Sequence, residues 1–304
     1  MKTLVGNFVI SDYFPHVNSV LAQSTRDGYR KMWGSYGRYF EQCALELRVC
    51  DCQFILRTIA SDNPKLNKTS LRHLKNFFSG IWAHALRMGA MDGANPWKSV
   101  AIPSAADANE THAYSPAEVE LMLSALGHPY DLIVLLAAAT GLRKSEIRGL
   151  QWGDWNAGTN TLAVSRAVWR SHVKTTKSKA SKAPVPVIPQ LADRLNAHRL
   201  GVSEADRQPD RFIFASKRGG SLDLDNVAQR IIAPAIARRG GIWFGWHSFR
   251  RGLATFLHAK GVPDKEIQRI LRHSNIAVTQ NSYVKVIPEN VRTAMANVSF
   301  GESA

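Results

Sequence analysis

The amino-acid sequence predicts a mainly α-helical protein with a small antiparallel β-sheet, divided into two domains. Its 304 residues fit two domains, since a typical domain has about 100–200 residues. Hydrophobic residues make up 45% of the chain and charged residues 21%, a composition that excludes a largely disordered or collagen-like protein. Apolar residues recur at helical spacing over much of the sequence, whereas only two short segments resemble strands.

The first domain is expected to consist of helices. Residues 25–52 carry apolar and aromatic side chains at helical spacing, and residues 70–88 repeat this pattern over a second long helix. Lys and Arg are interleaved with these positions. Aromatic side chains at helical spacing are expected to form a core. The cations between them are the better candidates for contacts with a phosphate. We assign residues 10–103 to this helical domain.

A linker between residues 99 and 114 is expected to separate the domains. It is rich in Ala, Ser, Asn and Asp and shows little periodicity. A helix start follows directly, because Ser115 can cap the first turn, Pro116 fits the first helical position, and Glu118 completes a capping box. The second domain is therefore expected over residues 114–304.

The second domain is predicted to combine helices with the small sheet. Residues 160–169 alternate in polarity and residues 185–188 are β-branched, so they are expected to be strands joined by the Lys-rich segment 174–182. Six helices are expected around them, at residues 115–126, 130–139, 191–200, 224–238, 248–259 and 264–271.

The charge of the chain suits a polyanionic partner. Lys and Arg number 39 and Asp and Glu 24, which gives a formal net charge of +15 at pH 7. The parts before and after Pro103 carry +6 and +9, so the excess is not confined to a tail. Residues 155–192 and 226–263 each contain six cations and no acidic residue. Such a distribution favours the phosphate backbone of DNA or RNA.

The sequence shows no convincing signal peptide and no segment suited to crossing a membrane. The longest uninterrupted apolar run, residues 132–139, is far shorter than the roughly 20 residues of a membrane-spanning helix. We therefore expect a cytoplasmic, nucleoid-associated protein without a membrane partner.

Polar groups suited to phosphate chemistry gather in four segments of the second domain. In the segment Thr-Gly-Leu-Arg-Lys-Ser-Glu, one helix is expected to end and another to begin, so that Arg143 projects from a turn and Glu146 can orient it. The Lys-rich segment is the second. In the third, His247 and Arg250 lie three residues apart on one helical face. The fourth runs from Leu-Arg-His-Ser to Tyr283, ten residues after His273.

Each of these motifs is weak alone, but in this order the segments resemble the tyrosine recombinase (phage integrase) family. The family's Thr-Gly-Leu-Arg-x-x-Glu signature is matched by residues 140–146, and its His-x-x-Arg motif by residues 247–250. Its hairpin Lys, which precedes a Ser and a Val-Pro pair, corresponds to Lys177. Its Leu-Gly-His-Ser motif and the Thr-x-x-Tyr that follows are similar to residues 271–274 and 279–283. The resemblance covers nearly the whole chain.

Three departures from the family pattern stand out. Arg272 replaces the usual Gly, and the gap between His273 and Tyr283 is one residue longer than the commonest form. Neither change removes a functional group. The third departure is the Ala-Pro pair at residues 183–184, where a basic residue and Thr often occur. Because this weakens the assignment of the lysine, Lys174 and Lys179 remain alternatives to Lys177.

The resemblance implies a core-binding domain over residues 10–103 and a catalytic domain over residues 114–304. Glu146 would support a catalytic set, made up of Arg143, Lys177, His247, Arg250, His273 and Tyr283. The tyrosine would attack the scissile phosphate, giving a 3′-phosphotyrosyl bond and a free 5′-hydroxyl, while the arginines stabilise the developing charge. This chemistry needs no metal and no cofactor.

The implied partners are double-stranded DNA recombination sites, on two of which the protein would act as a homotetramer. An accessory directionality factor is a further partner that the sequence leaves open. The reaction would integrate or excise a mobile element. The alternatives are an Xer-like resolvase of chromosome or plasmid dimers, a type IB topoisomerase, and a catalytically inactive DNA-binding regulator. A metal-dependent nuclease is disfavoured, because the sequence contains no His-x-His or His-Glu-x-x-His cluster.

Overall fold

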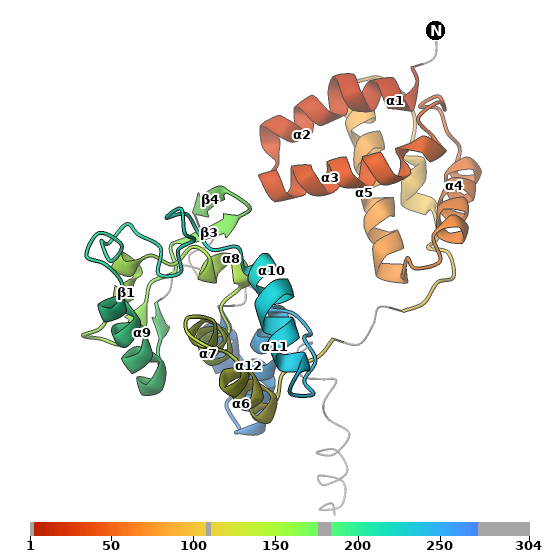
Figure 1. The fold of residues 1–304 in the computed structure, drawn as a ribbon. Coiled ribbons are helices and arrows are strands. Elements are labelled where there is room, and N and C mark those ends of the chain that lie inside the picture. Colours follow the sequence, from red (N-terminus) through yellow and green to blue (C-terminus); the bar gives the residue numbers. More distant parts are fainter. Residues whose placement is uncertain (1–2, 108–110, 176–183, 273–304) are drawn as a thin grey trace, which may run out of the picture. The chain divides into compact units, whose positions relative to one another are not determined.

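A computed structural model gives the structure of the chain and describes residues 3–107, 111–175 and 184–272. The chain divides into two compact units, residues 1–110 and 111–304 (Figure 1). Both units are built mainly from helices, and the second adds short antiparallel strands, which confirms the predicted fold class. Within the three described ranges, no helix is long and apolar enough to cross a membrane.

The first unit is built from helical segments that pack around a hydrophobic core with several aromatic side chains. Phe78 lies at its centre, with ring centroids 4.7 Å from Phe40 and 4.8 Å from Trp97. The long helix through Phe78 agrees closely with the predicted one. The helical segments are α1 (Val5–Phe8), η1 (Val9–Tyr13), α2 (Phe14–Val20), α3 (Gln23–Tyr36), η2 (Gly37–Tyr39), α4 (Val49–Asp62), α5 (Lys68–Arg87) and η3 (Pro96–Ser99).

The single helix expected over residues 25–52 is wrong, because the chain turns after α3. Gly37 follows this helix and packs on the indole of Trp33, where a Cβ atom would lie only 2.9 Å from the ring. The chain then folds back, and Ala44 forms an isolated β-bridge with Leu4. Beyond α3, Phe40 is buried in the core and Tyr39 is partly buried against it, so their helical spacing reflects burial and not a continuing helix.

The second unit is organised around the apolar helix α7, which contacts α6, α9 and α12. The start of the second unit agrees with the sequence: Ser115 is the N-cap of α6 and forms the expected capping box with Glu118. The helical segments are α6 (Pro116–Ala125), α7 (Tyr130–Thr140), α8 (Lys144–Ile147), η4 (Trp152–Asp154), α9 (Pro189–Gly201), α10 (Leu224–Val227), η6 (Ala228–Ile232), α11 (Ala233–Ala237), α12 (His247–Ala259) and α13 (Asp264–Leu271).

The second unit contains two small antiparallel sheets in its described part, where the sequence predicts one. The three-stranded sheet has the order β1 (Trp155–Asn156), β2 (Thr161–Leu162), β5 (Val185–Pro186). The other pairs β3 (Arg166–Trp169) with β4 (His172–Thr175). The predicted strand over residues 160–169 is thus divided between the two sheets, although its first part pairs with β5 as expected. Part of the Lys-rich segment, Lys174, belongs to β4.

Candidate active site

The described part of the site is built where α7 ends. Gly141 caps this helix in the left-handed conformation, with φ of 60°. A side chain on Gly141 would have no room, because a Cβ atom there would lie 2.7 Å from a methyl carbon of Leu271 and 3.2 Å from one of Leu253. The turn that carries Arg143 is therefore packed directly against α12 and α13.

Arg143 is held by Glu146 at the start of α8. The Arg143 guanidinium donates to Oε1 of Glu146 at 3.0 Å, and the Arg143 backbone N–H donates to Oε2 at 2.8 Å. The Glu146 side chain is only 5% exposed, whereas that of Arg143 is 40% exposed. A carboxylate fixed in the interior thus orients a guanidinium that a ligand can still reach.

Arg250 lies in the first turn of α12 and is buried. It donates to the carbonyl of Gly141 at 2.7 Å and also to the carbonyl of Leu271. Burial, followed by the positive charge of Arg143, lowers the pKa of Arg250 to about 9, so the group stays protonated at neutral pH. The two arginines lie close enough to repel each other, an arrangement that a bound anion would stabilise.

His247 is the first residue of α12 and faces the same charges. Although the residue is exposed, the packing of protein atoms around its ring lowers its pKa, and the positive charges of Arg251, Arg250 and Arg143 lower it further. His247 is therefore neutral at physiological pH in the absence of a ligand. A neutral imidazole can accept a proton or a hydrogen bond.

Arg272 also joins this cluster, which sequence reasoning did not foresee. It follows α13 in the left-handed conformation, with φ of 55°. Its guanidinium donates to Oε2 of Glu146 at 2.7 Å, and both side chains are buried. The only signal in the sequence was an arginine in a place where the resembled family usually has glycine.

The structure thus gathers four of the seven expected site residues, which are Arg143, Glu146, His247 and Arg250. The remaining three, Lys177, His273 and Tyr283, lie outside the described residues, so their placement stays a prediction. Of the two alternative lysines, Lys174 is in β4, and Lys179 lies outside the described residues.

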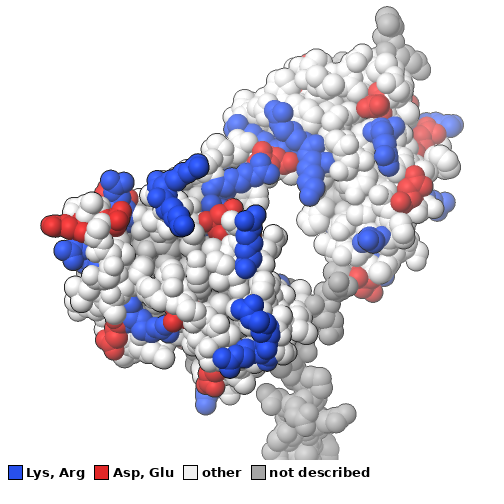
Figure 2. Space-filling model, in the orientation of Figure 1, with Lys and Arg blue, Asp and Glu red and all other residues white. Residues whose placement is uncertain are grey.

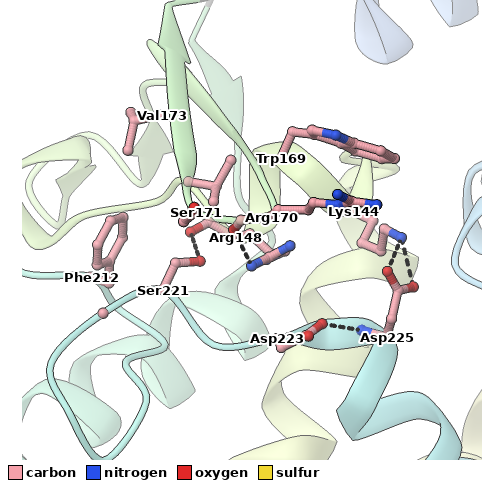
Figure 3. Close-up of a pocket in the computed structure, with 12 residues that line it drawn as sticks. Lys144, Arg148, Trp169, Arg170, Ser171, Val173, Phe212, Ser221, Asp223 and Asp225 are labelled. Carbon is pink, nitrogen blue, oxygen red and sulfur yellow. Dashed lines mark hydrogen bonds and ion pairs between the residues drawn. The ribbon is translucent and has the colours of Figure 1, made fainter. Parts of the chain in front are cut away.

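A hollow of about 760 Å³ lies beside α8, between the β3–β4 hairpin and α10 (Figure 3). Lys144 donates to both carboxylate oxygens of Asp225 at 2.6 Å, and Arg148 donates to the backbone carbonyl of Arg170 at 2.8 Å. Ser221 donates to the carbonyl of Arg148 at 2.8 Å. Through these contacts, polar groups that line the hollow are hydrogen-bonded to one another. They connect the end of α8 to the β3–β4 hairpin and the start of α8 to α10.

The surface chemistry of both units is basic. Figure 2 shows Lys and Arg side chains on the visible faces of both units, and in the sequence Lys and Arg outnumber Asp and Glu 13 to 9 over residues 1–110 and 26 to 15 over residues 111–304. Across residues 3–107, 111–175 and 184–272, no three His, Cys, Asp or Glu side chains are grouped so that they could hold a metal ion. The groups gathered around Arg143 are cations, a carboxylate and an imidazole, which together suit an anionic ligand.

Comparison with known proteins identifies a family. Residues 114–289 match the model of the phage integrase family, a range that covers more than half of the chain and includes all seven expected site residues. The tyrosine recombinase XerC-like protein of Caldanaerobacter subterraneus subsp. tengcongensis is 28% identical over 264 residues. This alignment covers 77% of the chain but only 66% of that relative.

Two solved structures share the fold. The Tn1549 transposon integrase in complex with a circular intermediate DNA has a TM-score of 0.78 at 18% identity, covering 97% of this chain and 99% of that one. The lambda integrase tetramer bound to a Holliday junction has a TM-score of 0.69 at 18% identity, covering 93% and 78%. At these identities the likeness establishes a shared fold. With the family match over residues 114–289, it follows that the chain belongs to the phage integrase family, the family of the tyrosine recombinases.

Proposed function

We propose that the protein is a site-specific DNA recombinase, which cleaves and rejoins duplex DNA through a 3′-phosphotyrosyl intermediate. The observation that carries this proposal is the cluster of Arg143, Glu146, His247 and Arg250 around the end of α7. In a chain of the phage integrase family, these residue types at this place are the groups needed to hold a phosphodiester and to move a proton.

The two arginines supply charge for the phosphate. Arg143 is half-exposed and oriented by a buried carboxylate, so it can meet a non-bridging oxygen without rearranging. Arg250 is fixed by the backbone carbonyls of Gly141 and Leu271 and adds a second positive charge beside Arg143. Charge grows on the phosphate oxygens as the bond to the attacking oxygen forms. Both contacts therefore strengthen in the transition state, which is what accelerates a reaction.

His247 supports the proton transfer. Its lowered pKa keeps the imidazole neutral, so it can help to remove the proton of the attacking tyrosine. We assign the attack to Tyr283, the single tyrosine that follows Arg143 in the sequence. His273 would donate to the same phosphate, and Lys177 would protonate the 5′-oxygen as it leaves.

The arrangement of the reaction follows from the family. Residues 10–103 would form the core-binding domain and residues 114–304 the catalytic domain, both contacting duplex DNA through their excess of cations. The relatives with known structures include a transposon integrase on DNA and an integrase tetramer on a Holliday junction. We therefore propose that four protomers act on two recombination sites to integrate or excise a mobile element, in the cytoplasm and at the nucleoid.

The test is the trapping of a covalent adduct. Duplexes are made from the DNA that flanks the gene, each with a nick placed so that a short cleaved fragment diffuses away and religation cannot occur. The chain should form a protein–DNA adduct that survives denaturing electrophoresis, with EDTA present throughout. Tyr283→Phe should bind the same duplexes almost as well but form no adduct.

Other outcomes would assign the alternatives. Binding without any adduct would indicate a DNA-binding regulator. Relaxation of supercoiled DNA without site preference would indicate a type IB topoisomerase, and loss of cleavage in EDTA would indicate a metal-dependent nuclease.

The role of Lys177 has its own test. Replacing the bridging 5′-oxygen with sulfur gives a leaving group that hardly needs a proton. Lys177→Ala should be slow on normal DNA and largely restored on the sulfur substrate, whereas Arg143→Ala should not be restored, because its charge acts on the non-bridging oxygens. If Lys174→Ala or Lys179→Ala is restored instead, the general acid is that lysine.

A further inference from the structure

We propose that Arg272 is a positioning residue of the cleavage reaction, which fixes the carboxylate of Glu146 and, through it, the guanidinium of Arg143. This inference rests on the proposed function. It assigns a role to Arg272, which stands where the family usually has glycine.

The backbone of Arg272 is in a conformation that favours glycine. Helix α13 ends at Leu271, and Arg272 caps it with φ of 55° and ψ of 43°. Its N–H donates to the carbonyl of Arg269 at 3.0 Å, which completes the last turn. The left-handed region is costly for a residue with a Cβ atom, so a glycine would fit this cap with less strain. An arginine in this strained conformation suggests that its side chain has a function that a glycine could not supply.

The side chain of Arg272 lies in the interior. It is 2% exposed and donates to Oε2 of Glu146 at 2.7 Å, and Glu146 is itself 5% exposed. Burying a guanidinium is unfavourable unless it is paired and hydrogen-bonded. Arg272 thus combines two unfavourable features, a left-handed backbone and a buried charge, and its side chain donates to Glu146.

That partner is the carboxylate that orients Arg143. Oε2 of Glu146 accepts from Arg272 and from the backbone N–H of Arg143, while Oε1 accepts from the Arg143 guanidinium. Three donors on two sides of the carboxylate prevent it from rotating. Without Arg272, the backbone N–H and the guanidinium of Arg143 would still donate to Glu146, but both belong to the same short segment, and the carboxylate and this segment could turn together.

Arg250 shows that the two segments are held as one unit. Its guanidinium bridges the carbonyl of Gly141, just before the Arg143 turn, and the carbonyl of Leu271, just before Arg272. The buried centre therefore contains the cations Arg250 and Arg272 and the anion Glu146, with Arg143 at its exposed edge. Because the Arg272 guanidinium is engaged by Glu146, its effect on a bound phosphate would pass through Glu146 and Arg143.

The experiment measures single-turnover cleavage of the nicked duplex at saturating DNA for Arg272→Gly and Arg272→Gln. Arg272→Gly keeps the backbone conformation favourable, so it isolates the loss of the guanidinium. We expect both variants to cleave between about tenfold and a hundredfold more slowly, the range expected for misplacing a group that orients the substrate. DNA affinity should change less than about twofold. A cooperative melting transition establishes that each variant is folded, and Arg272→Lys should recover part of the rate.

A double-mutant cycle distinguishes positioning from a merely structural role. If Arg272 acts through Glu146, then Arg272→Gln should slow cleavage little further in a Glu146→Gln background. The matched control is Arg269→Gln on the same helix, whose side chain is 66% exposed and pairs with Glu266 at the surface. This change should leave the cleavage rate unaltered.

The outcomes separate this inference from the proposed function. If the parent forms the adduct and Arg272→Gly cleaves at the parental rate, Arg272 has no positioning role and the recombinase assignment stands. Additive effects of Arg272→Gln and Glu146→Gln would overturn the coupling through Glu146 in the same way. If the parent itself forms no adduct on any duplex, the proposed function fails first.

Discussion

The two units of the molecule bury different kinds of side chain. In the described part of the first unit, the buried polar residues are His84 and Asn95, and the rest of its core is hydrophobic, with seven aromatic side chains among 21. The described part of the second unit buries five charged residues, which are Glu146, Arg148, Asp154, Arg250 and Arg272. The first unit therefore keeps its charge at the surface, whereas the second places charge in its interior.

This difference indicates where function is built into the fold. Burying ionised groups lowers stability unless they are well paired, so a domain rarely does so without a reason. Two of the five buried charges, Arg148 and Asp154, brace the β3–β4 hairpin, Arg148 through the carbonyl of Arg170 and Asp154 through Arg166. The other three lie around Arg143, where cations outnumber carboxylates. Among the described residues, this cluster contains three arginines and one carboxylate, a combination that suits an anionic ligand.

The two units should differ most when a cation is removed from each. Arg143→Ala and Arg250→Ala should lower single-turnover cleavage by about 10²–10³-fold, the effect of removing one preorganised donor to a developing charge. DNA affinity should fall much less, because these contacts strengthen in the transition state. The matched change in the first unit, Arg48→Ala, removes an exposed cation and should leave the rate at saturating DNA unchanged. An equal loss of rate in Arg48→Ala would contradict the comparison.

A second test compares the stability of the two cores. Glu146→Ala removes the carboxylate from the buried Arg272 and should cost about 3–5 kcal/mol of unfolding free energy. Phe78→Ala opens the aromatic core of the first unit and should cost a similar amount, about 3–5 kcal/mol. Denaturant unfolding, followed by fluorescence and by limited proteolysis, should assign each loss to a different unit. The claim of two separate cores is wrong if either variant destabilises both units equally.

A third test uses pH. The pKa of His247 lies below its usual value of about 6.5, so the neutral form that accepts a proton persists to lower pH. The cleavage rate at subsaturating DNA, which reports the free protein, should fall on acidification with a midpoint below about 6.5. Arg251→Gln removes a positive charge that lowers this pKa, so it should move the midpoint upward. His247→Asn should lack this acid limb, and a limb that persists in that variant would exclude His247 as its source.

The smallest expected change in stability concerns an arginine near the C-terminal end of α13. Arg269 and Arg272 are three residues apart in sequence, but the first pairs with Glu266 at the surface and the second with Glu146 in the interior. Arg269→Ala should change the unfolding free energy by less than about 1 kcal/mol, as is usual for exposed ion pairs. High salt should remove even this difference. A larger loss would mean that exposure does not separate the two kinds of ion pair in this protein.

Much of the fold could be predicted from local signals. The capping box at Ser115 and Glu118 fixes the start of α6, and the apolar pattern of residues 264–271 gives α13 with the observed bounds. The β3–β4 hairpin could not be predicted, because its turn contains Arg170 at φ of 53° in place of a glycine or asparagine. The end of α3 was missed because the apolar spacing continues past Gly37, where the α-helix passes into the short segment η2.

The candidate site shows the same limit. Arg143, Glu146, His247 and Arg250 follow from motifs whose spacing has a direct chemical meaning, and the structure places them together. Arg272 could be read from the sequence only as a replacement for glycine. Its contact with Glu146 joins residues 126 positions apart, and it depends on how α13 packs against the end of α7.

The proposed attack by Tyr283 is tested by identifying the residue of the protein that becomes attached to DNA. The adduct formed on the nicked duplex is digested with trypsin and nuclease, and the modified peptide is sequenced by mass spectrometry. Cleavage after Arg272 and Lys285 releases residues 273–285, in which Tyr283 is the only tyrosine. We predict that this peptide carries a nucleotide linked through its 3′-phosphate to Tyr283. A nucleotide on any other residue, or one linked through a 5′-phosphate, would contradict the proposed function.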